Sequence, residues 1–152
     1  MGRLFMNIIH VSTEQQLEQC LNIRKKVFVQ EQQVDIAIEV DEFDRSPDAC
    51  HHVLLTVNGE AAATGRMRPY DGETMKLQRI AVLKDQRGTG AGREIVLALE
   101  AKARELGYHH TILDAQVQAA AFYDKLGYTV TSAETFLDAG IPHVRMKKNI
   151  SL

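Results

Sequence analysis

The sequence has only two cysteines in 152 residues, and it has neither a strong charge imbalance nor a long apolar run. Two cysteines are too few for a disulfide framework, which favours a reducing compartment. A formal net charge of −2 provides no overall field for nucleic acid or anionic membranes, so any basic site has to be local. No stretch approaches ~18 consecutive apolar residues, and no signal-peptide pattern opens the chain. We therefore expect a cytoplasmic protein that spans no membrane and binds no nucleic acid.

Motifs for metal binding and for covalent catalysis are also absent. The sequence contains neither H-E-x-x-H nor C-x-x-C. Histidines occur as the neighbours His51-His52 and His109-His110. Neighbouring side chains on a strand point to opposite faces, so neither pair can bind one ion. Cys20 falls in an apolar helical stripe, where a small buried hydrophobe is the expected role. We expect no bound metal and no covalent acyl-enzyme.

The length suits one domain with one core, and we expect a single domain over residues 1–152. The hydrophobic periodicity predicts a strand, a helix, three hairpin-linked strands, a helix, a strand, a helix and two strands. This order is typical of a mixed sheet with helices on its faces, an α/β or α+β domain. The clearest local signals are a strand at 4–11, a helix at 13–29, an irregular loop at 30–49, hairpin turns at Asn58-Gly59 and Asp71-Gly72, and a bulge at Gly65.

The stretch "KLQRIAVLKDQRGTGAGREIV" (76–96) joins an apolar strand to an apolar helix through a basic, glycine-rich turn. A helix start offers unpaired N–H groups and a partial positive charge, and glycines let a phosphate approach the backbone closely. Arg87 adds a cation with forked donors. The turn therefore indicates an anion site, although a glycine-rich turn that only packs tightly is the alternative.

Two common phosphate motifs do not fit this turn. A Walker P-loop requires Gly-Lys-Ser/Thr after the glycines, whereas this turn has Gly92-Arg93-Glu94. A Rossmann fingerprint requires G-x-G-x-x-G in a crossover unit, and the glycine spacing here and the hairpin-linked strands before it both differ. The pattern that is left is R-x-x-G-x-G, from Arg87 to Gly92.

That turn resembles the acyl-CoA pyrophosphate loop of the GNAT superfamily of N-acetyltransferases. "QVQAAAFYDKLGY" (116–128) resembles the superfamily segment N-x-x-A-x-x-x-Y…G-[FY], with Gln116 in the usual Asn position and Tyr123 at the tyrosine. Two further segments, "RKKVFVQEQQV…EVDEFD" (24–44) and "FLDAGIPHVRM" (136–146), are similar to the YjcF/ElaA-like branch. The resemblance covers essentially the whole chain.

The resemblance implies a GNAT fold, with a mixed central sheet of six to seven strands flanked by about four helices, and acetyl-CoA as cosubstrate. In that family, backbone groups of the fourth strand bind the pantetheine arm and face the thioester oxygen. The residues that this carry-over assigns to the cofactor are Ile80, Ala81, Val82, Arg87, Gly88, Thr89, Gly90, Ala91, Gly92, Gln116, Ala119, Phe122 and Tyr123.

Tyr123 is the predicted general acid. A phenol with a pKa near ~10 stays protonated at neutral pH and can donate to a thiolate whose thiol has a pKa near ~8.5. An ordinary helical tyrosine is the alternative. The general base is less defined by the sequence, and Glu39 and His143 are the predicted catalytic candidates from a wider set that also includes Glu31, Asp41, Asp44 and His52.

Arg24 lies in the middle of an apolar helical stripe. Such an arginine either extends to the rim of the stripe or pairs with acids that fold over it. The loop acids Glu39, Asp41 and Asp44 could provide that pairing, order the loop and form an acidic rim for a cationic amine. We therefore expect Arg24, Asp41 and Asp44 near the acceptor.

The expected activity is transfer of an acetyl group from acetyl-CoA to a primary amine of a small molecule by direct attack. A non-catalytic acyl-CoA-binding module is the alternative. A less favoured one is an acyl-homoserine-lactone-synthase-like acyltransferase, since "R-x-x-V-F…E-x-D-x-x-D" also resembles the start of those enzymes. The GNAT resemblance further implies a possible homodimer.

Overall fold

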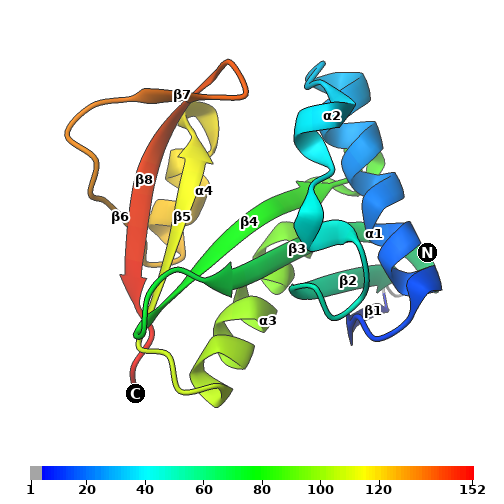
Figure 1. Ribbon diagram of the computed structural model, residues 1–152, viewed down its shortest axis with the longest axis horizontal. Helices are drawn as coiled ribbons and strands as arrows, with labels where there is room; N and C mark the ends of the chain where they lie inside the picture. Colours follow the sequence, from blue (N-terminus) through cyan, green and yellow to red (C-terminus); the bar gives the residue numbers. More distant parts are fainter. Residues whose placement is uncertain (1–4) are drawn as a thin grey trace. The chain divides into compact units, whose positions relative to one another are not determined.

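A computed structural model describes residues 5–152 of the chain (Figure 1). In chain order the elements are β1 (Met6–His10), α1 (Glu14–Arg24), the π-helical η1 (Lys25–Glu31), α2 (Ile36–Glu39), η2 (Glu42–Asp44), β2 (His51–Val57), β3 (Glu60–Pro69), β4 (Thr74–Val82), η3 (Lys84–Gln86), α3 (Ala91–Glu105), β5 (His110–Gln116), η4 (Val117–Ala119), α4 (Ala120–Lys125), β6 (Thr129–Val130), β7 (Phe136–Asp138) and β8 (Ile141–Asn149). The predicted strand at 4–11 is found at Met6–His10; Leu4 lies outside the described residues.

The strands form a mixed sheet. Its order is β1-β2-β3-β4-β5-β8-β6, and β7 pairs with β8. β4 and β5 are parallel, whereas β8 is antiparallel to β5, β6 and β7. The predicted mixed α/β architecture with about four helices is therefore confirmed, with four α-helices in residues 5–152. The same residues contain eight strands rather than six or seven, because Ala139 and Gly140 take positive φ angles of 50° and 77° and close a two-residue hairpin between β7 and β8.

The described residues divide into two compact units. The first runs up to Met67 and includes Arg79–Leu99; the second comprises Arg68–Gln78 and Glu100–Leu152. β4 and α3 each contribute residues to both units, so each half is described with its own unit. That residues 1–152 form a single domain stays a prediction.

In the first unit, β2 and β3 present two different faces. Leu54 shares a buried cluster with Cys20 and Ile23 of α1. The opposite face carries Gly65, where an added Cβ would lie 2.8 Å from Ile95 Cγ2 of α3. Gly65 therefore permits the close approach of α3. In the β2–β3 pair the register shift lies between Leu55 and Thr56 of β2 and not at Gly65.

The first helix begins as predicted but does not continue as an α-helix to residue 29. Thr13 is its N-cap and forms a capping box with Gln16. After Arg24 the chain widens into the π-helix η1, where Gln32 N–H donates to Val27 O, five residues back. Apolar spacing alone does not distinguish these two helix types, so the boundary was not predictable from periodicity.

The segment 30–49 is more ordered than expected. It contains α2 and η2, and their N-caps are Asp35 and Asp41, whose carboxylates accept from Ala37 N–H and Phe43 N–H. Asp44 also closes a capping box with Asp41, since Asp41 N–H donates to Asp44 Oδ2 over 3.0 Å. Acidic caps therefore hold this loop in a defined path.

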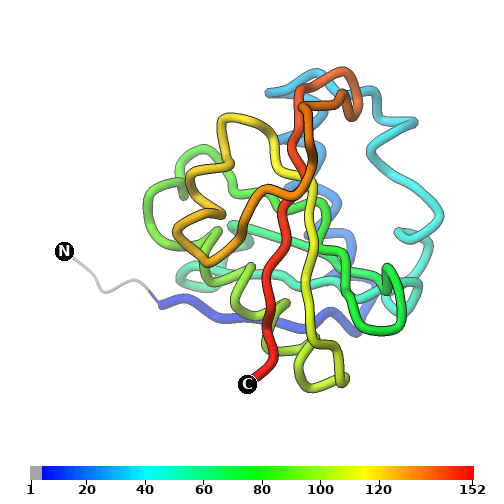
Figure 2. Tube along the Cα trace, turned by 90° about the vertical axis from the view of Figure 1, so that its left-hand side faces the viewer, coloured from blue at the N-terminus to red at the C-terminus, as the bar shows by residue number. Residues whose placement is uncertain are grey.

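In the second unit, β5 lies between the first half of β4 and β8. β4 pairs with β5 from Thr74 to Leu77, and β5 pairs with β8 along all seven of its residues, from His110↔Asn149 to Gln116↔His143. Figure 2 shows β5 (yellow) running beside β8 (red). None of the helices in residues 5–152 is long and apolar enough to cross a membrane.

Candidate active site

The glycine-rich turn lies in the first unit, between η3 and α3. Gly88 and Gly90 have φ angles of 81° and 93°, which residues other than glycine adopt only with strain. Thr89 Oγ1 donates to Gln86 O over 2.6 Å and closes the turn. The first α-helical bond of α3 joins Glu94 N–H to Gly90 O. The N–H groups that precede Glu94 in the first turn of α3 have no acceptor within the helix, so they can donate to an anion.

Arg87 is held beside this turn by two contacts. Its Nε donates to Val82 O over 3.1 Å, and its Nη2 donates to both carboxylate oxygens of Glu31, over 3.0 and 2.7 Å. Both side chains are partly exposed, so the pair is accessible to a ligand. The predicted cation is thus positioned at the turn, and Glu31, at the end of η1, is the group that orients it.

The strand predicted to bind the thioester has a break in its regular backbone. In β4, Arg79 takes a φ of 56°, the left-handed region, immediately before Ile80. Such a conformation costs about 1–3 kcal/mol for a residue other than glycine and persists only where surrounding contacts hold it. The main-chain groups of Ile80, Ala81 and Val82 follow this break.

A buried network of charges lies in the first unit, and Arg24 is at its centre, with 1% of its surface exposed. Arg24 donates to Glu39 Oε1 over 2.8 Å and to both oxygens of Asp44, over 2.7 and 2.9 Å. Arg66 of β3 donates to Asp44 Oδ1 over 2.9 Å and to both oxygens of Asp41, over 2.7 and 2.8 Å. The prediction that Arg24 pairs with the loop acids is confirmed for Glu39 and Asp44.

Arg79 adds a third cation to this network. Its side chain is within 3.3 Å of Glu39 Oε2 and 3.5 Å of Asp41 Oδ2. Three arginines thus match three carboxylates, so the loop acids carry no surplus negative charge that would attract a cationic amine. Arg66 and Arg79 were not predicted from the sequence as members of this site. The feature that could have identified them is the position of a charged residue inside an apolar strand.

The pKa values of the network carboxyls differ. Although burial opposes it, hydrogen bonds and charge from Arg24 and Arg66 hold the pKa of Asp44 well below its usual range. Burial raises the pKa of Glu39, against the opposing charges of Arg79 and Arg24. Burial also lowers the pKa of His52, whose Nε2 donates to Phe43 O over 3.1 Å. The roles of Arg24, Asp41 and Asp44 at an acceptor stay predictions, since the structure has these groups engaged with one another.

Tyr123 lies in the second unit, on the short helix α4. It is buried, and its ring makes edge contacts with Phe122 and Tyr128, at centroid distances of 5.0 and 6.0 Å. Burial raises the pKa of the Tyr123 phenol, so the hydroxyl stays protonated at neutral pH. Within residues 5–152 this hydroxyl has no hydrogen-bond partner, whereas that of Tyr128 bonds Thr111 and Glu100.

The second unit also places His143 opposite Gln116. The two are Cα partners in the β5–β8 pair. Nδ1 of His143 lies 2.6 Å from Ile141 O, and because a carbonyl can only accept, this nitrogen carries the proton. The ring stacks on Phe136 at 6.2 Å. Nε2 of the neutral ring is then the basic nitrogen, which suits a general base.

The predicted site residues thus fall into both units. The first unit holds Arg24, Glu39, Asp41, Asp44, Ile80–Val82 and Arg87–Gly92. The second holds Gln116, Ala119, Phe122, Tyr123 and His143.

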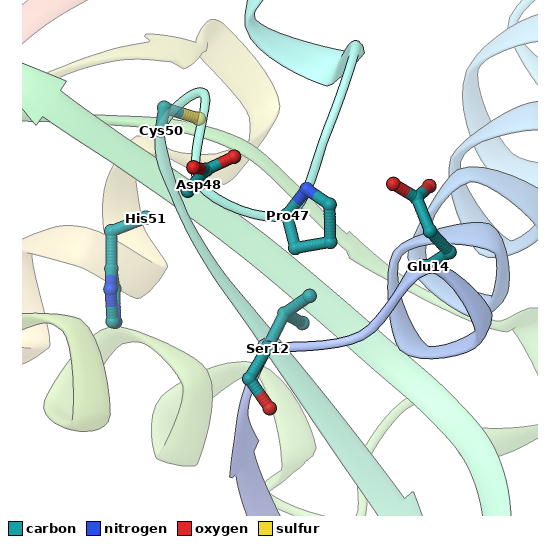
Figure 3. Close-up of a pocket in the computed structure, with 7 residues that line it drawn as sticks. Ser12, Glu14, Pro47, Asp48, Cys50 and His51 are labelled. Atoms are coloured by element: carbon teal, nitrogen blue, oxygen red, sulfur yellow. The ribbon is translucent and has the colours of Figure 1, made fainter.

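A separate open pocket of about 750 Å³ in the first unit contains none of these residues. In Figure 3, Asp48 and Cys50 lie close together before β2, and Glu14 lies at the start of α1. Burial raises the pKa of Cys50 to about 11, so its thiol is protonated at neutral pH and is not an activated nucleophile. Among residues 5–152 no group of three or more His, Cys, Asp or Glu side chains is arranged to hold a metal.

Comparisons with known proteins agree with the geometry. The family model "Acetyltransferase (GNAT) domain" matches residues 10–150, so the chain belongs to the GNAT acetyltransferase family and is an acyltransferase. Members of this family transfer acyl groups from acyl-CoA to amines.

Individual relatives define the branch. The chain is 46% identical to the Bacillus subtilis (strain 168) protein YyaT, covering 96% of this chain and 97% of that protein. It is 41% identical to the N-acetyltransferase YjcF of the same organism, covering 95% and 100%. The fold is shared with Escherichia coli ElaA, at a TM-score of 0.81, 24% identity and coverage of 97% and 100%. The resemblance to the YjcF/ElaA-like branch is confirmed.

Proposed function

We propose that this chain transfers an acetyl group from acetyl-CoA to a primary amine of a small molecule, by direct attack of the amine on the thioester. The observation that carries the proposal is the Gly88–Gly92 turn, whose positive-φ glycines lead into the N–H groups at the start of α3 beside Arg87. Two kinds of donor, the main-chain N–H groups at the helix start and a guanidinium, lie at one exposed turn, which suits the diphosphate of CoA.

The reaction requires two proton transfers. The amine nitrogen bonds to the thioester carbon, and the carbon–sulfur bond breaks as the tetrahedral intermediate collapses. Tyr123 donates its hydroxyl proton to the departing thiolate, and the base accepts a proton from the amine. A main-chain N–H of the Ile80–Val82 stretch stabilises the oxyanion between these steps.

His143 is the better candidate for the base. Glu39 is 3% exposed and is already bonded to Arg24, so taking up a proton would disrupt a buried ion pair. The Nε2 of His143 is basic in the neutral tautomer that Ile141 O selects. We therefore assign Glu39 to the ion network and His143 to proton transfer.

Calorimetry and a thiol-release assay test this function together. Wild-type protein is titrated with CoA, and free thiol is then followed with acetyl-CoA and a panel of primary amines. We expect binding and amine-dependent thiol release, and Arg87→Ala should weaken CoA binding roughly tenfold because a charge-assisted contact is lost. Binding without amine-dependent release would contradict transfer and favour a CoA-binding module.

A further inference from the structure

The left-handed conformation of Arg79 coincides with an unusual set of side-chain contacts. The guanidinium donates from Nε to Glu39 O over 3.2 Å and from Nη2 to Ile38 O over 3.3 Å. The same group is 3.3 Å from Glu39 Oε2 and 3.5 Å from Asp41 Oδ2. One side chain of β4 therefore binds the last turn of α2 through two main-chain carbonyls and the carboxylate of Glu39, and it also contacts the carboxylate of Asp41 just beyond α2.

These contacts explain how the strained backbone persists. A φ of 56° in a strand is unfavourable for arginine, and the conformation is kept only if the surroundings determine it. The segment that Arg79 contacts is itself held in place, because Arg24 donates to Glu39 O over 2.7 Å and Arg66 binds Asp41 and Asp44. Arg79 thus contacts a segment whose buried residue, Glu39, is itself held by Arg24.

The consequence falls on the residues that follow. The peptide that joins Arg79 to Ile80 is oriented by the Arg79 torsions, so the direction of the Ile80 N–H depends on the conformation that the side chain maintains. In the proposed function this stretch faces the thioester. We propose that Arg79 is a positioning residue for acyl transfer: it ties loop 36–44 to β4 and thereby aims the main-chain donors of Ile80–Val82. This inference rests on the proposed function.

Substitutions at Arg79 separate the side chain from the backbone strain. Glycine and asparagine adopt a positive φ at low cost, so Arg79→Gly and Arg79→Asn remove the contacts while allowing the native torsions. Arg79→Lys keeps the charge but replaces the planar fork with a point charge. Arg45→Gly, at the exposed residue that directly follows loop 36–44, is the matched control.

We expect kcat of Arg79→Gly and Arg79→Asn to fall at least ~tenfold, with the CoA dissociation constant within ~twofold of wild type, since an oxyanion donor acts in the transition state. Guanidinium ion at low millimolar concentration should raise kcat of Arg79→Gly at least threefold and leave Arg45→Gly unchanged. Arg79→Lys should have a log kcat closer to that of Arg79→Gly than to that of the wild type. A kcat within twofold of wild type in both variants, or CoA affinity that falls in parallel with kcat, would overturn the proposal.

Hydrogen exchange keeps this test independent of the proposed reaction. Amides of peptides covering 79–83 and 36–44 should exchange at least ~tenfold faster in Arg79→Gly than in Arg45→Gly, because their mutual anchor is lost. Wild-type protein that releases no thiol with any amine would refute the proposed function alone. Unchanged exchange in both peptides would refute the role of Arg79, whatever the activity.

Discussion

The most deeply buried polar networks of the two units are built in contrasting ways. In the first, three arginines meet three carboxylates in one network around Arg24. In the second, Tyr128 is fully buried and its hydroxyl bonds Thr111 and Glu100, and Lys148 donates to Glu100 over 2.8 Å. The first network consists of arginines paired with carboxylates, whereas the second consists of neutral hydroxyls and one ion pair. Removal of a single group should therefore be far more damaging in the first.

The largest expected effect is that of Asp44→Ala. Asp44 accepts from both Arg24 and Arg66, so its loss leaves two buried guanidinium groups with one partner fewer. We expect a loss of about 3–5 kcal/mol in the free energy of unfolding, measured by urea denaturation. Asp48→Ala, at an exposed carboxylate, is the control. Stability equal to that of the control would mean that the network adds nothing.

Tyr128→Phe should have a smaller effect. It removes the two hydroxyl bonds, but Glu100 keeps its contact with Lys148. The expected cost is about 1–3 kcal/mol by the same urea measurement, less than that of Asp44→Ala. The reverse order of the two variants would contradict the contrast between ionic and neutral networks.

Tyr123→Phe should change the rate rather than the stability. The hydroxyl has no hydrogen-bond partner within residues 5–152, so its removal costs little in folding, but the proposed proton donor is lost. We expect at least a tenfold fall in turnover, or about 1.4 kcal/mol, with CoA affinity nearly unchanged. An unaffected rate would remove Tyr123 from the mechanism.

The two networks should also lose their contributions to folding stability at opposite ends of the pH scale. The pKa values of Asp41 and Asp44 are lowered in the folded protein despite the opposing effect of burial, chiefly by their arginine partners. Their stabilisation is therefore present above the ordinary Asp pKa of ~3.9 and is lost as pH falls through the folded values. His52, whose pKa burial lowers, adds a loss that begins as pH falls below ~6.5.

Tyr128 behaves in the reverse sense. Burial, and then the charge of Glu100, raise its pKa, so its contribution is complete below the ordinary tyrosine pKa of ~10 and declines as pH rises above it. Urea midpoints between pH 3 and 11 in wild type, Asp44→Ala and Tyr128→Phe measure both limbs. An acid limb that is unchanged in Asp44→Ala would contradict the assignment.

Sequence patterns predicted most of the strands and three of the helices, in their order along the chain, because alternation and helical spacing report directly on burial; they did not predict the order of the strands in the sheet or helix α2. The pairing of Arg24 was predictable as well, since a buried guanidinium requires carboxylates and the nearest acids lie in one loop. Arg66 was not, because both arginines of "GRMR" point to the same face of β3 and the sequence does not indicate which of them meets the loop acids; the contacts with Asp41 and Asp44 decide it.

Backbone irregularities were the least predictable features. The φ of 56° at Arg79 accompanies contacts with Ile38 and Glu39, which are distant in sequence, and the hairpin at Ala139-Gly140 uses alanine in a conformation that it seldom adopts. Such departures leave no local signal. They also lie next to residues that the proposed function requires, and strained backbone conformations are commonly found at functional sites.

The most direct test of the central claim is a crystal structure with CoA bound. We expect electron density for the diphosphate at the N–H groups of Gly88–Gly92, beside Arg87. Density for the diphosphate at any other part of the chain would contradict it.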